Sequence, residues 1–97
     1  MKPYTLQEIR EIVSKLAEQY GVKRIYLFGS YARGDTTDSS NIDLRIDKRN
    51  VKGLQLAGLL LDLEDSSGMR VDLIPTTSLD QQFLDSIKNE VLLYEAS

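Results

Sequence analysis

Apolar residues recur through the first part of the chain at the spacing of an amphipathic helix. The positions three or four residues apart are Leu6, Ile9, Val13, Leu16 and Tyr20. This spacing places them on one face of a helix from Thr5 to Tyr20. Thr5 and Glu8 can form a capping box at its start, and Gly21 suits the left-handed conformation that ends a helix.

Four further segments have the alternation or the continuous apolar run of a strand. They are Val22 to Phe28, Asn41 to Asp47, Arg70 to Ile74 and Val91 to Tyr94. The second alternates cleanly, so Ile42, Leu44 and Ile46 are expected to face the core. The third stops at Pro75, and we expect the fourth at a sheet edge. Between the first two, Gly29 to Gly34 is predicted as a turn with one short helical turn, followed by a polar loop over 35–40.

A second long helix is predicted from Val51 to Asp65, and its leucines cover more than one stripe. A helix that is apolar on most sides is buried on most sides. In a chain of this size, that pattern fits either core packing alone or contact with a partner protein or second copy. A last helix is predicted to end at Asn89, with Ser78 and Gln81 as a capping box. The residues it is expected to bury are Leu79, Phe83, Leu84 and Ile87.

These elements predict a single α/β domain over residues 1–97, with helices packed on a small mixed sheet of three or four strands. The chain has no cysteine and no histidine, so disulfides, zinc–thiolate sites and imidazole bases are excluded. A net charge of −3 argues against general nucleic-acid binding. No apolar run approaches the roughly 20 residues that cross a bilayer, so we expect a cytoplasmic protein with no membrane association.

Three polar features could carry chemistry. Gly29 and Ser30 directly follow an apolar strand, and such a turn can hold phosphate oxygens, with Arg33 adding a charged contact. Asp43 shares its predicted strand face with Asn41 and Asp47, and because positions two apart on a strand point the same way, such side chains can reach one cation. Asp72 points out of the third strand and would join Asp43 if the two strands are neighbours. Each feature alone is more often an ordinary turn or a solvated surface, but all three occur in order in one chain.

The run Gly-Ser-Tyr-Ala-Arg-Gly-Asp at 29–35, followed by Ser-Asn-Ile-Asp-Leu-Arg-Ile-Asp at 40–47, resembles the minimal nucleotidyltransferases of the polymerase-beta-like superfamily. The order of helices and strands agrees along nearly the whole chain. The resemblance implies a nucleotidyltransferase fold in which Gly29 and Ser30 bind a nucleoside triphosphate. It also implies that Asn41, Asp43 and Asp72 occupy the three carboxylate positions that bind magnesium, or manganese in its place.

The same resemblance implies a reaction and a partner. The reaction transfers a nucleoside monophosphate from a triphosphate, most simply ATP, to a hydroxyl, and the third carboxylate assists deprotonation of that hydroxyl. Many such small proteins resemble the antitoxin of a toxin–antitoxin pair and act beside a helical HEPN-type toxin, which some modify on a tyrosine. A homo-oligomer is the alternative assembly.

The sequence departs from this pattern at the first carboxylate position, where Asn41 replaces the usual Asp. An amide offers a neutral oxygen where the site needs an anion, and the loss could slow transfer by several orders of magnitude. Asp35, Asp38 or Asp47 could compensate, and only Asp47 shares the strand face. Two functions therefore stay open: a magnesium-dependent nucleotidyltransferase, or an impaired nucleotidyltransferase-fold antitoxin that acts by protein contact.

Overall fold

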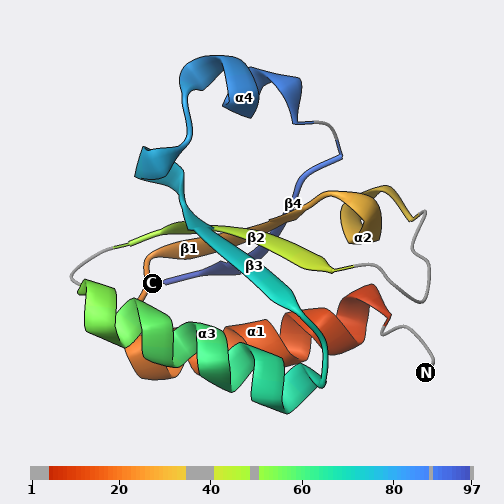
Figure 1. The fold of residues 1–97 in the computed structure, drawn as a ribbon. Coiled ribbons are helices and arrows are strands. Elements are labelled where there is room, and N and C mark those ends of the chain that lie inside the picture. The colour runs from red at the N-terminus through yellow and green to blue at the C-terminus, as the bar shows by residue number, and fades with distance from the viewer. Residues whose placement is uncertain (1–4, 35–40, 49–50, 88, 97) are drawn as a thin grey trace.

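The computed structural model describes residues 5–34, 41–48, 51–87 and 89–96, and shows one mixed sheet with two long helices on one face (Figure 1). The strand order is β3-β2-β1-β4, with β2 and β3 parallel and the other neighbours antiparallel. The elements in chain order are α1 (Leu6–Tyr20), β1 (Arg24–Phe28), α2 (Ser30–Arg33), β2 (Ile42–Asp47), α3 (Gly53–Ser67), β3 (Val71–Pro75), the 3-10 helix η1 (Thr76–Ser78), α4 (Gln81–Ser86) and β4 (Val91–Glu95). The α/β class predicted from the sequence is confirmed, and β4 lies at a sheet edge as expected.

Helix α1 begins and ends as its sequence predicts. The Glu8 backbone N–H donates to the Thr5 hydroxyl at 3.1 Å, and the Thr5 N–H donates to the Glu8 carboxylate at 2.9 Å. Gly21 ends the helix with a φ of 71°, a conformation that costs glycine little. The capping box and the terminal glycine are therefore both confirmed.

The core lies between the sheet and the two long helices α1 and α3 (Figure 1). Ile42, Leu44 and Ile46 of β2 are all buried, which confirms the predicted core face of this strand. Because successive strand residues point to opposite faces, burying these three sends the charged residues between them to the other side. The largest fully buried side chains are Ile9, Val13, Val22, Ile25, Leu27, Leu44, Ile46, Leu59 and Leu63.

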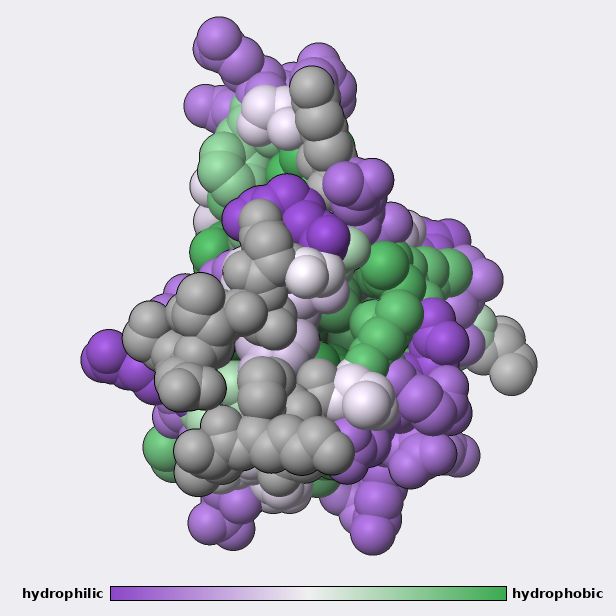
Figure 2. Space-filling model, turned by 90° about the vertical axis from the view of Figure 1, so that its right-hand side faces the viewer, coloured by the Kyte–Doolittle hydropathy of each residue, from purple (hydrophilic) through white to green (hydrophobic). Residues whose placement is uncertain are grey.

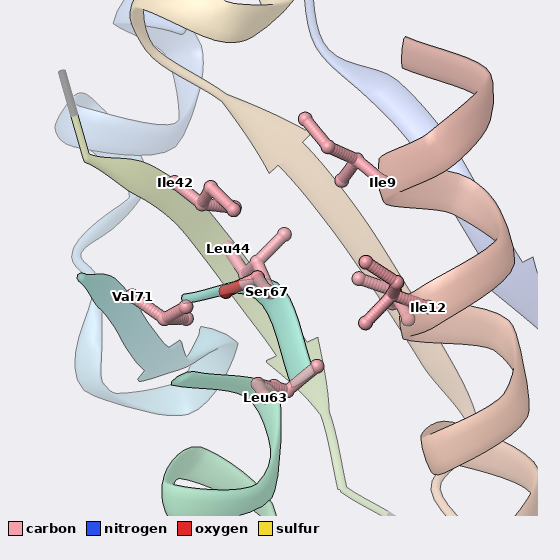
Figure 3. Close-up of a pocket in the computed structure, with 8 residues that line it drawn as sticks. Ile9, Ile12, Ile42, Leu44, Leu63, Ser67 and Val71 are labelled. Carbon is pink, nitrogen blue, oxygen red and sulfur yellow. The ribbon is translucent and has the colours of Figure 1, made fainter. Parts of the chain in front are cut away.

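A small apolar cavity remains within this core, between α1, β2, β3 and the end of α3 (Figure 3). Its volume is about 10 Å³, roughly the space of one water-sized sphere. Ser67 contributes a hydroxyl to the lining, and that oxygen accepts a hydrogen bond from the Met69 N–H at 3.2 Å. The cavity is therefore a packing gap too small for a substrate.

The opposite face of the sheet carries Asp43 and Arg45 beside Tyr26 and Phe28, and the segment with α4 lies on this side (Figure 1). Arg45 of β2 fixes both ends of this segment. Its guanidinium forms a bidentate ion pair with the Glu90 carboxylate, in which Arg45 Nη2 donates to Glu90 Oε1 at 2.8 Å. Arg45 Nη1 donates to the Thr76 hydroxyl at 3.0 Å. The same group lies over the Tyr26 ring, 3.8 Å from its centroid. Arg45 thus anchors the α4 segment above the sheet.

Of the two explanations for the leucine-rich helix, core packing alone is wrong, and contact with a partner or second copy stays a prediction. α3 buries Leu59 and Leu63, whereas Leu54 is 88% exposed and Leu61 is 65% exposed. The helix covers the sheet with one face only, because nothing else in the described part of the chain packs over its outer side. The helix also starts later and ends later than predicted, at Gly53 and Ser67, with Gly68 as its left-handed cap.

The predictions for the last helix are also partly wrong. The N-terminal cap of α4 is Asp80, whose carboxylate accepts from the Phe83 N–H at 2.7 Å, while Ser78 lies in η1. The expected burial fails too: Phe83 is 41% exposed, and no residue of α4 is fully buried. These residues stay exposed because α4 lies on the side of the sheet away from the core.

Two further expectations concern the polar loop and membrane association. The predicted polar loop over 35–40, including Asp35 and Asp38, lies outside the described residues. Within the described ranges, no helix has the length and apolar character needed to span a membrane.

Candidate active site

The two candidate carboxylates lie directly opposite each other on neighbouring strands. Asp43 of β2 pairs with Asp72 of β3 in the parallel register, and on the other side Asp43 pairs with Phe28 of β1. Directly opposed residues share a sheet face. Asp72, Asp43 and Phe28 therefore form one row across three strands, about 10 Å from end to end at the usual strand spacing. The condition stated from the sequence, that the third strand neighbours the second, is met.

Gly29 lies against the Asp43 carboxylate. Its φ of 77° and ψ of −154° belong to a region that is almost restricted to glycine. A Cβ at this position would overlap Asp43 Oδ2 and come within 3.0 Å of its Cγ. The chain thus needs glycine here for two reasons, the backbone conformation and the close approach of the carboxylate.

Burial and a like charge raise the pKa of Asp43 to about 6, from an ordinary value of 3.8. Burial is the largest cause, followed by the hydrogen bond with Asp72 and the charge of that residue. The positive charge of Arg33 acts in the opposite direction. The pair therefore holds negative charge at a cost in the ligand-free protein, and a bound cation would relieve that cost.

The short helix α2 holds the remaining predicted contacts. Ser30 is its first residue, and Arg33 lies in its last turn, close enough to Asp43 to lower the pKa of that carboxyl. Tyr31 anchors α2, because its ring is buried and its hydroxyl donates to Met69 Sδ at 3.3 Å. The structure thus brings Gly29, Arg33 and the two aspartates together.

Asn41 is half-buried and immediately precedes β2, two residues before Asp43. Asp47, the carboxylate that the sequence suggests as a replacement, instead forms ion pairs with two arginines. It pairs with Arg24 at 3.5 Å and with Arg45 at 3.6 Å, at the far end of β2 from Asp43. Asp47 therefore does not supply the negative charge that Asn41 lacks.

The donor set fits a hard divalent cation. Two facing carboxylates supply oxygen ligands, and magnesium typically takes only one or two carboxylates from a protein and the rest from water and phosphate. In the ranges that the structure describes, no three Asp, Glu, His or Cys side chains form a metal-binding cluster, which agrees with an amide, Asn41, at the first of the three ligand positions. A cation at this row would therefore depend on nucleotide phosphates for much of its coordination.

A cleft that sequence reasoning missed opens beside the row, between Gly29 and α4. Its volume is about 380 Å³. The rings of Phe28 and Phe83 meet edge to face at its border, with centroids 6.1 Å apart and planes at 84°. The sequence predicts Phe83 as a buried residue, because apolar spacing alone does not tell which side of a sheet a helix covers. The residues that line the cleft are Phe28, Gly29, Arg33, Phe83, Ser86 and Ile87.

Residues 10–97 match the family described as polymerase beta, nucleotidyltransferase. The chain belongs to this nucleotidyltransferase family. A provisionally named protein adenylyltransferase of Methanocaldococcus jannaschii is 39% identical over 97 residues, covering 93% of this chain and 97% of that protein. The protein adenylyltransferase MntA of Thermococcus cleftensis is 34% identical over 97 residues, covering 95% and 98%.

Solved structures agree with this family assignment. A provisionally named minimal nucleotidyltransferase has a TM-score of 0.77 and 32% identity, with 89% of each chain covered. A chain from a toxin–antitoxin complex with AMP-PNP has a TM-score of 0.69 and 26% identity, covering 95% of this chain and 76% of that one. The nucleotidyltransferase fold predicted from the sequence is thus confirmed, and nucleotidyl transfer is the chemistry that the family supports.

Proposed function

We propose that this nucleotidyltransferase transfers AMP from ATP to a hydroxyl group on a partner protein, with magnesium as cofactor and manganese as the alternative. The observation that supports this proposal is the facing pair Asp43 and Asp72, packed against Gly29. ATP as donor and a protein as acceptor follow the names of the two relatives reported above, one called a protein adenylyltransferase and the other provisionally named so.

The residues divide the binding of the donor between them. Gly29 and Ser30 would hold the triphosphate, with the Arg33 charge beside it. Asp43 and Asp72, with the Asn41 amide oxygen, would hold the cation. Bound magnesium would supply positive charge that neutralises the phosphates as they react.

The acceptor reaches the site from the side of Asp72. This residue is exposed and lies on the edge strand β3, whereas Asp43 is half-buried within the sheet. The acceptor oxygen would attack the α-phosphorus and form a new P–O bond. The bond between the α-phosphorus and the bridging oxygen breaks, pyrophosphate leaves, and the acceptor proton passes to the Asp72 carboxylate.

The deciding experiment incubates the chain with magnesium, α-labelled ATP and the protein encoded by a neighbouring gene. We expect label on the partner and release of pyrophosphate, both lost in Asp43→Ala. Asp65→Ala is the matched control, since Asp65 is an exposed carboxylate on α3. Transfer that survives Asp43→Ala would refute the assignment of the site.

A second function is favoured by Asn41 together with the exposed leucines of α3. In this alternative, an impaired nucleotidyltransferase fold acts as an antitoxin by binding a helical HEPN-type toxin. Binding to a second copy of the chain is the other possible contact. Leu54 and Leu61 lie on the outer side of α3 and are available for such contact. The alternative predicts that the native chain transfers no label, that Asn41→Asp restores transfer, and that Leu54→Glu with Leu61→Glu abolishes binding of the partner in size-exclusion chromatography.

A further inference from the structure

Strand β3 forms the edge of the sheet on the side where the proposed acceptor arrives. The strand order places β3 outermost, beside β2, and Asp72 is its second residue. Helices α1 and α3 cover one face of the sheet, and the lobe that contains α4 stands over the other, above the body of the molecule (Figure 1 and Figure 2). A further chain segment can therefore join the sheet at an edge strand, where alternate backbone N–H and C=O groups have no partner within the sheet.

The register of β3 shows which of its backbone groups point outward. The Ile42 N–H donates to the Arg70 carbonyl oxygen at 3.0 Å, and Ile42 lies opposite Val71. In a parallel pair, this register directs the N–H and C=O of Asp72 toward β2. The backbone groups of Val71 and Leu73 therefore point away from β2, toward the outer side of β3.

Two features narrow the available part of this edge to Leu73. The outward N–H of Val71 donates to the Glu64 carboxylate of α3 at 3.2 Å, which also agrees with the direction derived from the register. Pro75, the last residue of β3, has no N–H. Within the described part of the chain, Leu73 is thus the residue of β3 whose outward N–H and C=O can both pair with an added strand. Its neighbour in the chain is Asp72.

We propose that the acceptor protein binds as an extended segment, which pairs with the edge of β3 at Leu73 and places a hydroxyl-bearing residue opposite Asp72. This inference rests on the proposed function, because it takes Asp72 as the base for the acceptor hydroxyl. Antiparallel pairing is the more stable arrangement, and in it the residue opposite Asp72 belongs to a pair without mutual hydrogen bonds, with Cα atoms about 4.5 Å apart. The segment extends the row Phe28–Asp43–Asp72 by one position on the same face of the sheet.

Backbone pairing defines the acceptor by its conformation as well as by its hydroxyl. The segment must be extended, with its own N–H and C=O groups free to pair, so a hydroxyl residue within a stable helix is not a substrate. A serine or threonine fits directly opposite Asp72, while the longer side chain of a tyrosine reaches from a diagonal position about 7–8 Å away. Main-chain hydrogen bonds supply affinity for many sequences, and the position of Asp72 selects the residue that is modified.

The test compares Leu73→Pro with Leu73→Ala in the transfer assay, with the protein encoded by the neighbouring gene as acceptor. Both variants lose the same half-buried side chain, but only proline lacks the outward N–H, and its ring fills the space where a strand would pair. Proline is tolerated on an edge strand when the missing N–H faces outward. We expect the KM for the acceptor to be at least about 10-fold higher in Leu73→Pro than in Leu73→Ala, the loss expected from about two hydrogen bonds. Affinity for ATP with magnesium, measured by calorimetry, should be the same in both variants.

A second measurement does not depend on the folding of Leu73→Pro. Mass spectrometry locates the labelled residue of the acceptor, and a short synthetic peptide centred on that residue serves as substrate for the native chain. N-methylation of the residue before the hydroxyl residue, which would pair with Leu73, should abolish labelling. N-methylation of the hydroxyl residue itself should be tolerated, because in antiparallel pairing its N–H points away from β3.

The outcomes separate this inference from the function on which it rests. Equal acceptor KM in two variants that circular dichroism shows to be folded, or equal labelling of the two N-methylated peptides, would overturn the edge site and leave the proposed function standing. A native chain that is dimeric in size-exclusion chromatography, and becomes monomeric in Leu73→Pro but not in Leu73→Ala, would also overturn it by assigning the edge to a second copy. Absence of transfer by the native chain would overturn the function and the edge site together.

Discussion

The facing carboxylates make a direct prediction about stability: Asp43→Asn should stabilise the ligand-free protein at neutral pH. In the folded chain, burial and Asp72 raise the pKa of Asp43 to about 6, against 3.8 for the ordinary group. A carboxyl whose folded pKa is raised destabilises the fold when it is charged. That penalty is complete above pH 6, shrinks as the pH falls through the folded pKa, and is gone below the unfolded pKa.

The size of the effect follows from the shift. A difference of about 2 pKa units corresponds to about 3 kcal/mol. Because the Asp43 carboxyl is half-buried and partly screened by water, about 1–2 kcal/mol of this should be measurable. An amide has nearly the same shape and no charge, so Asp43→Asn removes the penalty without opening a cavity.

Urea unfolding in chelator-treated buffer, at several values between pH 4 and 8, measures the prediction. The free energy of unfolding of Asp43→Asn should exceed that of the native chain at pH 7.5, and the gap should close toward pH 4. Asp65→Asn makes the same chemical change on the exposed surface of α3 and should shift the free energy by less than about 0.5 kcal/mol. A variant that is no more stable at pH 7.5, or a gap independent of pH, would refute the account of the carboxylate pair.

Four other substitutions test the fold, two beside the site and two on α3. Gly29→Ala should lower the free energy of unfolding by about 2–3 kcal/mol in urea titrations, because both the backbone conformation and the overlap with the carboxylate above it oppose a methyl group. Arg45→Met should cost about 1.5–3 kcal/mol and speed protease cleavage within 76–90, since it leaves Glu90 without its charged partner. In thermal unfolding, Leu59→Ala should cost about 3 kcal/mol, whereas Leu54→Ala should change stability by less than about 0.5 kcal/mol.

The sequence predicts the geometry of the row because strand alternation has a strict period of two. Once Ile42 and Leu44 are assigned to the core, Asp43 must point to the other face, and the structure places it there. The register with Asp72 could be stated only conditionally. Alternation fixes the face of a residue, while its cross-strand partner depends on which strands are neighbours.

The errors have one physical cause. Apolar spacing shows which residues share a face, but it does not show whether the chain has enough material to cover that face. Leu54 and Leu61 satisfy the helical pattern and lie exposed, since α3 packs on the sheet by its other side. Phe83 and Phe28 satisfy apolar patterns too, and they line a cleft on the side of the sheet away from the core. The exposed leucines of α3 are also the surface where the second function proposed above places a partner.

The positions of the two site aspartates do not depend on the residue at position 41, whereas the total charge of the site does. Asp43 and Asp72 are positioned by residues that point away from them, since their strand neighbours Ile42, Leu44 and Val71 are buried. None of these constraints involves the side chain of Asn41, which lies just before β2. Exchanging Asn41 for Asp therefore restores a negative charge to a row that is already in place, with no repacking of the core. Any deficit caused by this residue should consequently appear in cation affinity and in the rate of transfer, while the fold stays unchanged.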